Sequence, residues 1–324
     1  MKASRHPLLF QANTRVWLRR LRKASGRAAT LDDIPDAELE ALAASGFEWV
    51  WMLGVWQTGP ASRSVSLSRP EWRREFEQTL PDLSDDDIGG SCFAIRSYTV
   101  ARGLGGAAAL KRLRRRLAAR GLRLMLDFVP NHMALDHPWV TEHPDYFVQG
   151  TDEDLALSPE NYFRTPEGRA LAHGRDPHFP GWPDTVQLNY ANPAVREAMA
   201  AQLEAVSKLC DGARCDMAML LLPEVFQRTW SLAAGPFWPE AIVRVRRKAP
   251  GFVFLAEVYW DLEWTLQQQG FDYCYDKRLY DRLRHGEAGP VRDHLRAGLD
   301  YQSHLARFLE NHDELRAAAA FPPG

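Results

Sequence analysis

The alternation of apolar runs and amphipathic segments is the feature that most limits how this 324-residue chain can fold. Mostly apolar runs occur at Phe47–Leu53, Leu122–Val129 and Phe252–Ala256, and segments whose apolar residues have helical spacing lie between them. Such runs are typical of buried parallel strands, which need long crossover connections, usually helices. The pattern therefore predicts an α/β fold with a parallel sheet and helical crossovers.

Seven strands are expected, in residues 7–18, 47–53, 122–129, 212–216, 252–257, 271–275 and 303–309. Helices are expected at Leu31–Ala44, Ala107–Arg120, Asn192–Leu209 and Pro239–Lys248, and a short one where Ser68 and Glu71 have capping-box spacing. Polar residues gather at the carboxyl ends of the strands, where a barrel of eight strands and eight helices carries its active site. We therefore predict a (β/α)8 TIM-type barrel, apparently truncated after its seventh strand.

The segment 132–190 differs from the rest of the chain because it is irregular and rich in Pro, His, Asp and aromatic residues. A connection of that length inside a compact domain is usually functional. The expected organisation is residues 1–131 as the first part of the barrel, 132–190 as a small inserted domain over the active site, and 191–324 as the remainder. The remainder lacks an eighth strand and a C-terminal β domain, which favours a piece of a longer enzyme.

Composition excludes several classes of partner. A net charge of −2 argues against a dedicated nucleic-acid or acidic-membrane binder. We also find no apolar run long enough for a signal peptide or a membrane span. The four cysteines have neither metal-type nor disulfide-scaffold spacing, which is typical of buried thiols. We therefore expect a cytoplasmic protein with no nucleic-acid or membrane partner.

Ionisable residues stand at the ends of four predicted strands. They are Asp127 with His132 beyond it, Arg214 with Asp216, Glu257, and His312 with Asp313. Side chains two apart on a strand share a face, so the guanidinium at position 214 should keep the carboxylate at 216 ionised and oriented. One strand-end carboxylate is more often a solvated or capping group. Four strand ends that converge on one mouth predict a single site.

Four short motifs around these residues resemble the alpha-amylase family, glycoside hydrolase family 13. D-x-V-x-N-H stands at Asp127–His132, G-x-R-x-D at Gly212–Asp216, the acid after an apolar strand at Glu257, and N-H-D at Asn311–Asp313. A supporting region similar to the family begins at Gly90–Ile95. The resemblance runs from about residue 8 to the end of the chain, and the four motifs in this order are highly specific.

The resemblance implies a retaining mechanism in which Asp216 is the nucleophile, Glu257 the general acid and then base, and Asp313 a third carboxylate that holds sugar hydroxyls. A retaining glycosidase needs two carboxyls about 5–5.5 Å apart, one ionised and one protonated. We expect Arg214 to lower the pKa of Asp216. The apolar strand before Glu257 is expected to raise the pKa of the acid.

Substrate-binding roles are implied for five residues: Phe93, Asp127, His132, Arg214 and His312. The two histidines would bond sugar hydroxyls and the arginine would orient the nucleophile, whereas Asp127 would brace the site. Phe93 stands where the family usually has a stacking Tyr, so the ring is kept and the hydroxyl is lost. Trp182 is equally consistent with a sugar platform and with core packing.

The chain also departs from the family. Many starch-cleaving members carry Lys and His where this chain has Met219 and Leu220, which argues against ordinary alpha-amylase activity. Asn131 stands where a calcium ligand often lies, but the inserted segment lacks a clear set of acidic ligands, so we expect no cofactor and no metal.

The function favoured by the sequence is a retaining alpha-glycosidase that acts on an oligosaccharide or a small alpha-glucoside. Alternatives from the same chemistry are a transferase or an isomerase, in which a sugar intercepts the covalent intermediate instead of water. A catalytically silent barrel that binds sugar or a partner protein also stays open. A metal hydrolase built on His132 and His312 is weaker, because its ligands lack a compact spacing such as HExxH.

Overall fold

The computed structural model describes residues 6–321, and its centre is one sheet of seven parallel strands. In spatial order the strands are β1 (Leu9–Asn13), β2 (Trp49–Leu53), β5 (Arg123–Phe128), β10 (Gly212–Cys215), β11 (Val253–Ala256), β12 (Tyr273–Tyr275) and β13 (Leu305–Ala306). Each lies within one of the predicted ranges. The prediction of a parallel α/β sheet with seven strands in barrel order is therefore confirmed.

Helices lie between these strands and after the last of them. They include α1 (Thr14–Ser25), α2 (Asp36–Ala44), α5 (Gly106–Ala118), α8 (Pro193–Ser207), α9 (Pro223–Trp230), α10 (Trp238–Lys248), α11 (Glu263–Gln268), α12 (Lys277–His285), α13 (Ala288–His294), α14 (Leu299–Ser303) and α15 (Ala317–Ala320). Both α5 and α8 pack on β5, and α8 also packs on β10 and α10. Within residues 6–321, no helix combines the length and the apolar character needed to cross a bilayer.

Two local predictions about helices are wrong. The helix expected at Leu31–Ala44 is interrupted, because a short 3-10 helix ends at Asp33 and α2 begins only after Pro35. Proline disfavours helical geometry in the residue before it. Helix α4 (Pro70–Thr79) begins at the expected place but without the expected cap, because Ser68 ends α3 (Pro60–Ser68) and its hydroxyl donates back to the Val65 carbonyl.

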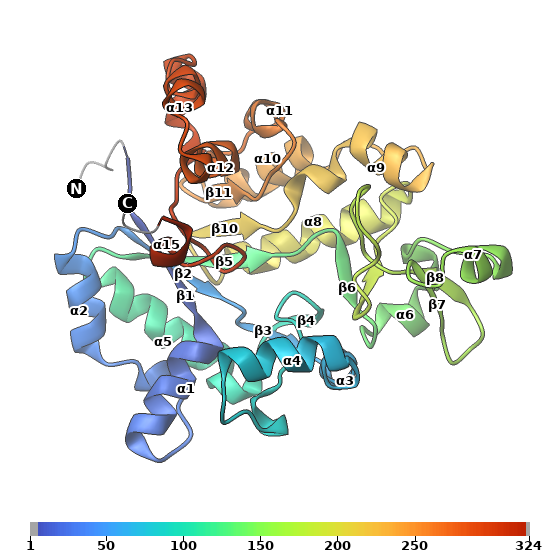
Figure 1. The fold of residues 1–324 in the computed structure, drawn as a ribbon, viewed down its shortest axis with the longest axis horizontal. Helices are drawn as coiled ribbons and strands as arrows, with labels where there is room; N and C mark the ends of the chain where they lie inside the picture. Colours follow the sequence, from blue (N-terminus) through green and yellow to red (C-terminus); the bar gives the residue numbers. More distant parts are fainter. Residues whose placement is uncertain (1–5, 322–324) are drawn as a thin grey trace.

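Two insertions stand at the carboxyl end of the sheet. The first lies between β2 and α5 and contains β3 (Trp56–Thr58), α3, α4 and β4 (Ile95–Val100). The second follows β5 and holds two antiparallel pairs, β6 (His132–Ala134) with β9 (Thr185–Gln187) and β7 (Tyr162–Arg164) with β8 (Ala170–Ala172), and the helices α6 (Trp139–Glu142) and α7 (Asp152–Leu157). Figure 1 shows the second insertion, in green, at one end of the molecule beside α8 and α9. Its assignment as a separate domain over residues 132–190 stays a prediction.

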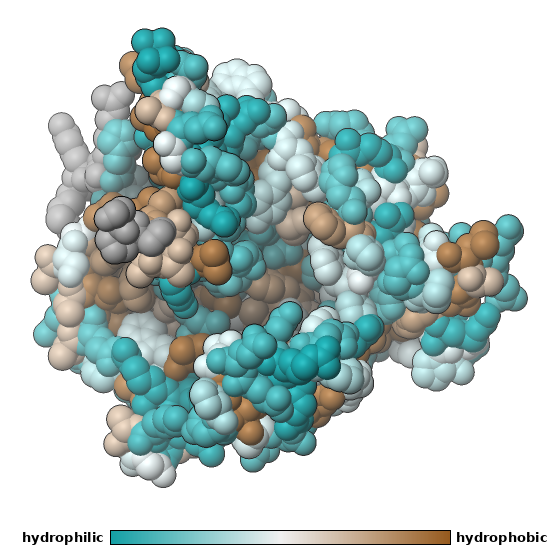
Figure 2. Space-filling view, in the orientation of Figure 1, coloured by the Kyte–Doolittle hydropathy of each residue, from teal (hydrophilic) through white to brown (hydrophobic). Residues whose placement is uncertain are grey.

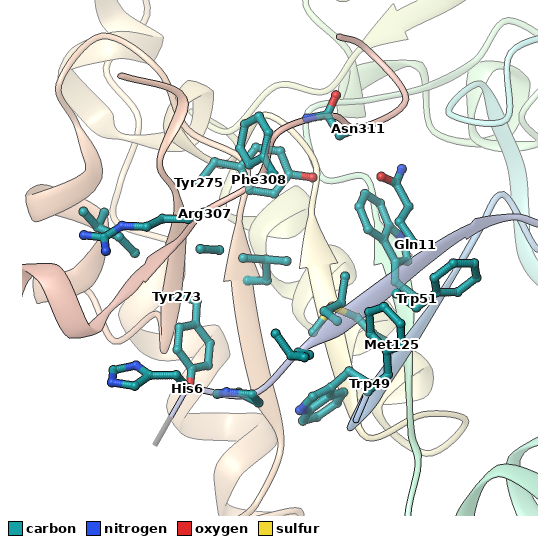
Figure 3. Close-up of a pocket in the computed structure, with 18 of the residues that line it drawn as sticks. His6, Gln11, Trp49, Trp51, Met125, Tyr273, Tyr275, Arg307, Phe308 and Asn311 are labelled. Atoms are coloured by element: carbon teal, nitrogen blue, oxygen red, sulfur yellow. The ribbon is translucent and has the colours of Figure 1, made fainter. Parts of the chain in front are cut away.

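The strands β1 and β13 form the two edges of the sheet, and among residues 6–321 no strand pairs with the outer side of either. Side chains from the inner face of the sheet line a cavity of about 1160 Å³ near these edges. Figure 3 shows Trp49, Trp51, Tyr273 and Tyr275 around this space, with Gln11 at one end of it. We call it the edge cavity.

Candidate active site

The backbone ladder continues for one residue beyond the strands that carry the predicted catalytic carboxyls. The Asp216 amide donates to the Phe128 carbonyl at 2.8 Å, and the Glu257 amide donates to the Cys215 carbonyl at 3.0 Å. Strand β10 lies between β5 and β11, so both carboxyls start from paired backbone in the middle of the sheet. Their positions are thus set by the sheet and not by a free loop.

A single arginine holds both carboxyls. Nη1 of Arg214 lies 2.5 Å from Oδ1 of Asp216, and Nη2 lies 2.7 Å from Oε2 of Glu257. The arginine side chain is only 1% exposed. Its guanidinium lies 5.2 Å from the ring of Trp51 and 5.2 Å from the ring of Phe93, so aromatic faces cover the cation where no carboxylate does.

Burial dominates the protonation of this group of charges. It raises the pKa of Asp216 even though Arg214 opposes the shift, so the expectation of a lowered pKa for Asp216 is wrong in its net direction. Burial likewise raises the pKa of Glu257, as expected, and the charge of Asp216 adds to the shift. Partial desolvation and the charge of Glu257 raise the pKa of Asp313 to about 6, although its side chain is 46% exposed. Three carboxyls around one buried cation favour a state in which one of them keeps a proton.

The two histidines from the motifs are held neutral. Burial lowers the pKa of His132 to about 4, and burial together with the nearby Arg214 lowers the pKa of His312 to about 3. Nε2 of Gln11 lies 2.7 Å from Nδ1 of His312; an amide nitrogen only donates, so the ring proton sits on Nε2. Within residues 6–321 that Nε2 has no hydrogen-bond partner, although Oδ2 of Asp313 lies 3.2 Å away.

A cavity of about 680 Å³ joins most of the predicted residues. Seven of the eight line it, and they are Phe93, His132, Arg214, Asp216, Glu257, His312 and Asp313. The eighth, Asp127, is 1% exposed and does not line this cavity. Its two oxygens accept hydrogen bonds from Nε1 of Trp51 at 2.9 Å and from the Gly54 amide at 2.8 Å. The structure thus gives Asp127 bracing contacts, and the roles of the other seven stay predictions.

The mouth of this cavity carries Trp182, which the sequence left open as a sugar platform, and two aromatic residues that the sequence did not single out. Trp72 and Phe76 are one turn apart on α4, and both line the cavity. Since no residue of α4 is buried, these two rings do not serve a core. Trp182 lines the cavity from the second insertion, with its ring centroid 5.1 Å from that of His132. Figure 2 shows this face of the molecule hollowed above the largely hydrophilic α4.

Tyr259 and Met217 are further residues at the site that were not predicted. The Tyr259 hydroxyl donates to Oε1 of Glu257 at 2.8 Å, and the Met217 amide donates to Oε2 at 2.7 Å. Tyr259 stands two positions after the acid, the same spacing as Arg214 and Asp216, so this spacing was an available signal. The bond from Met217 involves only the backbone and leaves no signal in the sequence.

The residues around Asn131 do not fit a calcium site. Its side-chain amide donates to Oε1 of Gln187 at 3.1 Å, and its Oδ1 accepts from Nε2 of Gln187 at the same distance. The carboxamide is therefore used within the fold, between the start of the second insertion and its end. In the part of the chain that the structure describes, no group of three or more His, Cys, Asp or Glu is placed to hold a metal ion.

Comparisons with known proteins agree with this geometry. The family model for the alpha amylase catalytic domain matches residues 93–259, which is more than half of the chain. The alpha-amylase MalA of Haloarcula japonica is 25% identical over 68% of this chain and 30% of its own length. A trehalose synthase of Thermus thermophilus is 28% identical over 60% of this chain and 23% of its own length. The chain thus spans less than half the length of these curated relatives.

Solved structures show the same fold. An alpha-amylase from Lactobacillus plantarum aligns with a TM-score of 0.63 at 21% identity, over 98% of this chain and 66% of its own. A debranching enzyme from Nostoc punctiforme aligns with a TM-score of 0.65 at 18% identity, over 98% of this chain and 66% of its own. With seven of the predicted residues gathered in one cavity and a family match across the strands that carry most of them, this chain belongs to the alpha-amylase family.

Proposed function

We propose that this protein cleaves alpha-glucosides with retention, with Asp216 as the nucleophile and Glu257 as the acid and base. The observation that carries the proposal is the shared Arg214, whose two terminal nitrogens each bind one of the carboxyls. Bonds to one guanidinium keep the two carboxyls close together. This supports the separation of about 5–5.5 Å used for retention over the separation of about 6.5–9.5 Å used for inversion.

The reaction proceeds in two displacements. In the first, Asp216 forms a bond to the anomeric carbon while Glu257 gives its proton to the departing glycosidic oxygen, which takes the electron pair of the broken bond. In the second, Glu257 takes a proton from the acceptor hydroxyl as that oxygen displaces Asp216. The unpartnered Nε2 of His312 and the nearby Asp313 would bind hydroxyls of the sugar under attack.

The size of the cavity supports a small substrate. About 680 Å³ falls within the range of about 300–1,000 Å³ typical of pockets that enclose a small ligand. A short oligosaccharide or a small alpha-glucoside fits that range. Water as the acceptor gives hydrolysis, which we favour.

Glycosyl transfer to a second sugar is the other candidate. It is favoured by the rings of Trp72, Phe76 and Trp182 around the mouth, which offer apolar faces to an acceptor sugar. Relatives named as a trehalose synthase and as a maltosyltransferase accompany the amylases among the matches. Product analysis with and without added sugar separates the two acceptors, because transfer yields a new oligosaccharide.

The test is the Asp216→Asn variant, assayed with aryl alpha-glucosides and malto-oligosaccharides. We expect turnover to fall by about a thousandfold or more, because the amide cannot form the glycosyl-enzyme. A slow fluorosugar substrate should label the peptide that contains Asp216, as detected by mass spectrometry. Asp152→Asn is the matched control, since Asp152 is 87% exposed on the second insertion.

Two results would contradict the proposal. One is a covalent adduct on another residue, together with unchanged turnover in the Asp216→Asn variant. The other is sugar binding without turnover in the wild-type chain, which would support the silent binding barrel.

A further inference from the structure

The two oxygens of the Glu257 carboxyl have different surroundings. Oε2 lies 2.7 Å from Nη2 of Arg214 and accepts from the Met217 amide at 2.7 Å. Both neighbours are N–H donors that cannot accept a proton. A proton on Oε2 would therefore face two donors at hydrogen-bond distance. The transferable proton belongs on Oε1.

Oε1 has one side-chain partner of a different kind. The Tyr259 hydroxyl lies 2.8 Å from it and lines the same cavity as Asp216 and Asp313. Burial, together with the charge of Glu257, raises the pKa of Tyr259 well above its ordinary value, so the hydroxyl stays protonated while the carboxyl gains and loses its proton. One lone pair of Oε1 takes the tyrosine bond, and the other is free for the catalytic proton.

We propose that Tyr259 is the positioning residue of the general acid. Its hydroxyl holds Oε1 of Glu257 where that oxygen gives its proton to the departing glycosidic oxygen, as the bond to the anomeric carbon breaks. In the second displacement the same contact holds Oε1 toward the acceptor hydroxyl, whose proton it takes. This assignment rests on the proposed function and adds the identity of the reacting oxygen.

The turn after Tyr259 is built to keep this side chain in place. Trp260 and Asp261 both have left-handed backbone conformations, with φ of 63° and 62°. Two such non-glycine residues cost about 1–2 kcal/mol each, and such strain persists where the surroundings enforce it. Here His178 packs against the Trp260 ring at 4.9 Å, and Arg278 lies 2.7 Å from Asp261.

Met217, which follows β10, also has a strained backbone next to a catalytic carboxyl. It has φ of 43° directly after Asp216, and this conformation accompanies the bond from its amide to Oε2. Of the four non-glycine residues with positive φ among residues 6–321, three therefore lie within four positions of Asp216 or Glu257. The backbone strain of the molecule is concentrated at these two carboxyls, as expected for a preorganised site.

The test is Tyr259→Phe, assayed with two substrates that differ in their need for acid catalysis. Maltose has a poor leaving group, and we expect its kcat/KM to fall by about 10–100-fold, part of what a general acid contributes. In a dinitrophenyl alpha-glucoside the leaving group is dinitrophenolate, which departs without being protonated. The kcat/KM of this substrate should change by less than about threefold. The alkaline limb of the pH profile should move to higher pH, because the tyrosine bond favours ionised Glu257.

The ratio of the two values makes the test independent of folding yield, because any inactive fraction lowers both by the same factor. Tyr301→Phe is the matched control, since it removes a tyrosine hydroxyl on α14, outside this cavity, and should leave both values unchanged. Equal losses on both substrates, or no loss on maltose, would overturn the assignment. If the wild-type chain turns over neither glucoside, the proposed function fails and the assignment fails with it. If the wild type is active and Tyr259→Phe loses equally on both substrates, only the assignment of Tyr259 is overturned.

Discussion

Two cavities lie on the inner side of one sheet, and they differ in chemistry and in how their walls are held. The catalytic cavity of about 680 Å³ is lined by four charged residues from the motifs, and the edge cavity of about 1160 Å³ is lined mainly by aliphatic and aromatic side chains (Figure 3). Trp51 and Tyr275 line the edge cavity and contact Arg214, which lines the catalytic one. These three side chains thus join the two linings, and His312 lines both spaces.

The difference follows strand pairing. Arg214 lies on β10, Asp216 follows β10 and Glu257 follows β11, and each of these strands is paired on both sides. Asp313 comes after β13, an edge strand of only two residues, and its side chain is 46% exposed. Two-sided pairing thus holds the carboxyls of the proposed displacement, whereas the third carboxyl depends on an edge. The side chains that need the most accurate placement are therefore held by the strands in the middle of the sheet.

Removing the shared cation should have the largest effect. Arg214→Met leaves Asp216 and Glu257 as buried carboxyls without a counter-charge, so we expect a loss of about 3–5 kcal/mol in the free energy of unfolding and loss of turnover. Chemical denaturation at pH 7 measures the stability. Arg112→Met is the control, because Arg112 forms an exposed pair with Asp32, and its effect should be much smaller. If both variants lose a similar, small amount of stability, Arg214 is not needed to compensate the buried carboxyls.

Substitutions of two leucines on central strands should have effects of intermediate size on stability, and they test the difference between the two cavities. Leu126 on β5 is fully buried and does not line the edge cavity, so Leu126→Ala should cost about 3–4 kcal/mol. Leu255 on β11 lines the edge cavity, where one side already lacks partner atoms, so Leu255→Ala should cost about 1–2 kcal/mol. Denaturant unfolding of both variants gives the difference. Equal losses would show that the edge cavity is filled in solution.

The last comparison concerns proton uptake in the catalytic cavity. His132 has a pKa of about 4 in the folded chain because of burial, below its ordinary value. The unfolded chain therefore binds a proton that the folded chain does not, and stability falls as the pH drops from about 6.5 to about 4. This contribution reaches about 3 kcal/mol in wild type and is absent from His132→Gln.

Urea unfolding at pH 7.5 and at pH 4.5 measures this dependence, since other titrating groups are the same in both proteins. We expect His132→Gln to lose less stability than wild type between the two values. His285→Gln, on the exposed end of α12, should keep the wild-type dependence. An unchanged dependence in His132→Gln would show that the ring takes up its proton within the fold.

The local sequence pattern was enough to predict the strands of the sheet and the place of the site. Apolar runs such as Leu122–Val129 and Phe252–Ala256 predicted the parallel strands, because burial on both faces requires nearly continuous apolar residues. Charged residues directly after those strands predicted the site, because the carboxyl ends of parallel strands meet at one edge. Strand positions and the gathering of six motif residues therefore needed no knowledge of tertiary contacts.

Features that depend on contacts between distant segments could not be predicted in this way. The net direction of the Asp216 pKa depends on how completely the fold buries the carboxyl, which its neighbour Arg214 does not reveal. The bond from Gln11 to His312 spans nearly the whole chain, and it sets the proton position on a ring of the site. Burial and long-range hydrogen bonds arise only when the chain is packed, so they leave no local pattern to read.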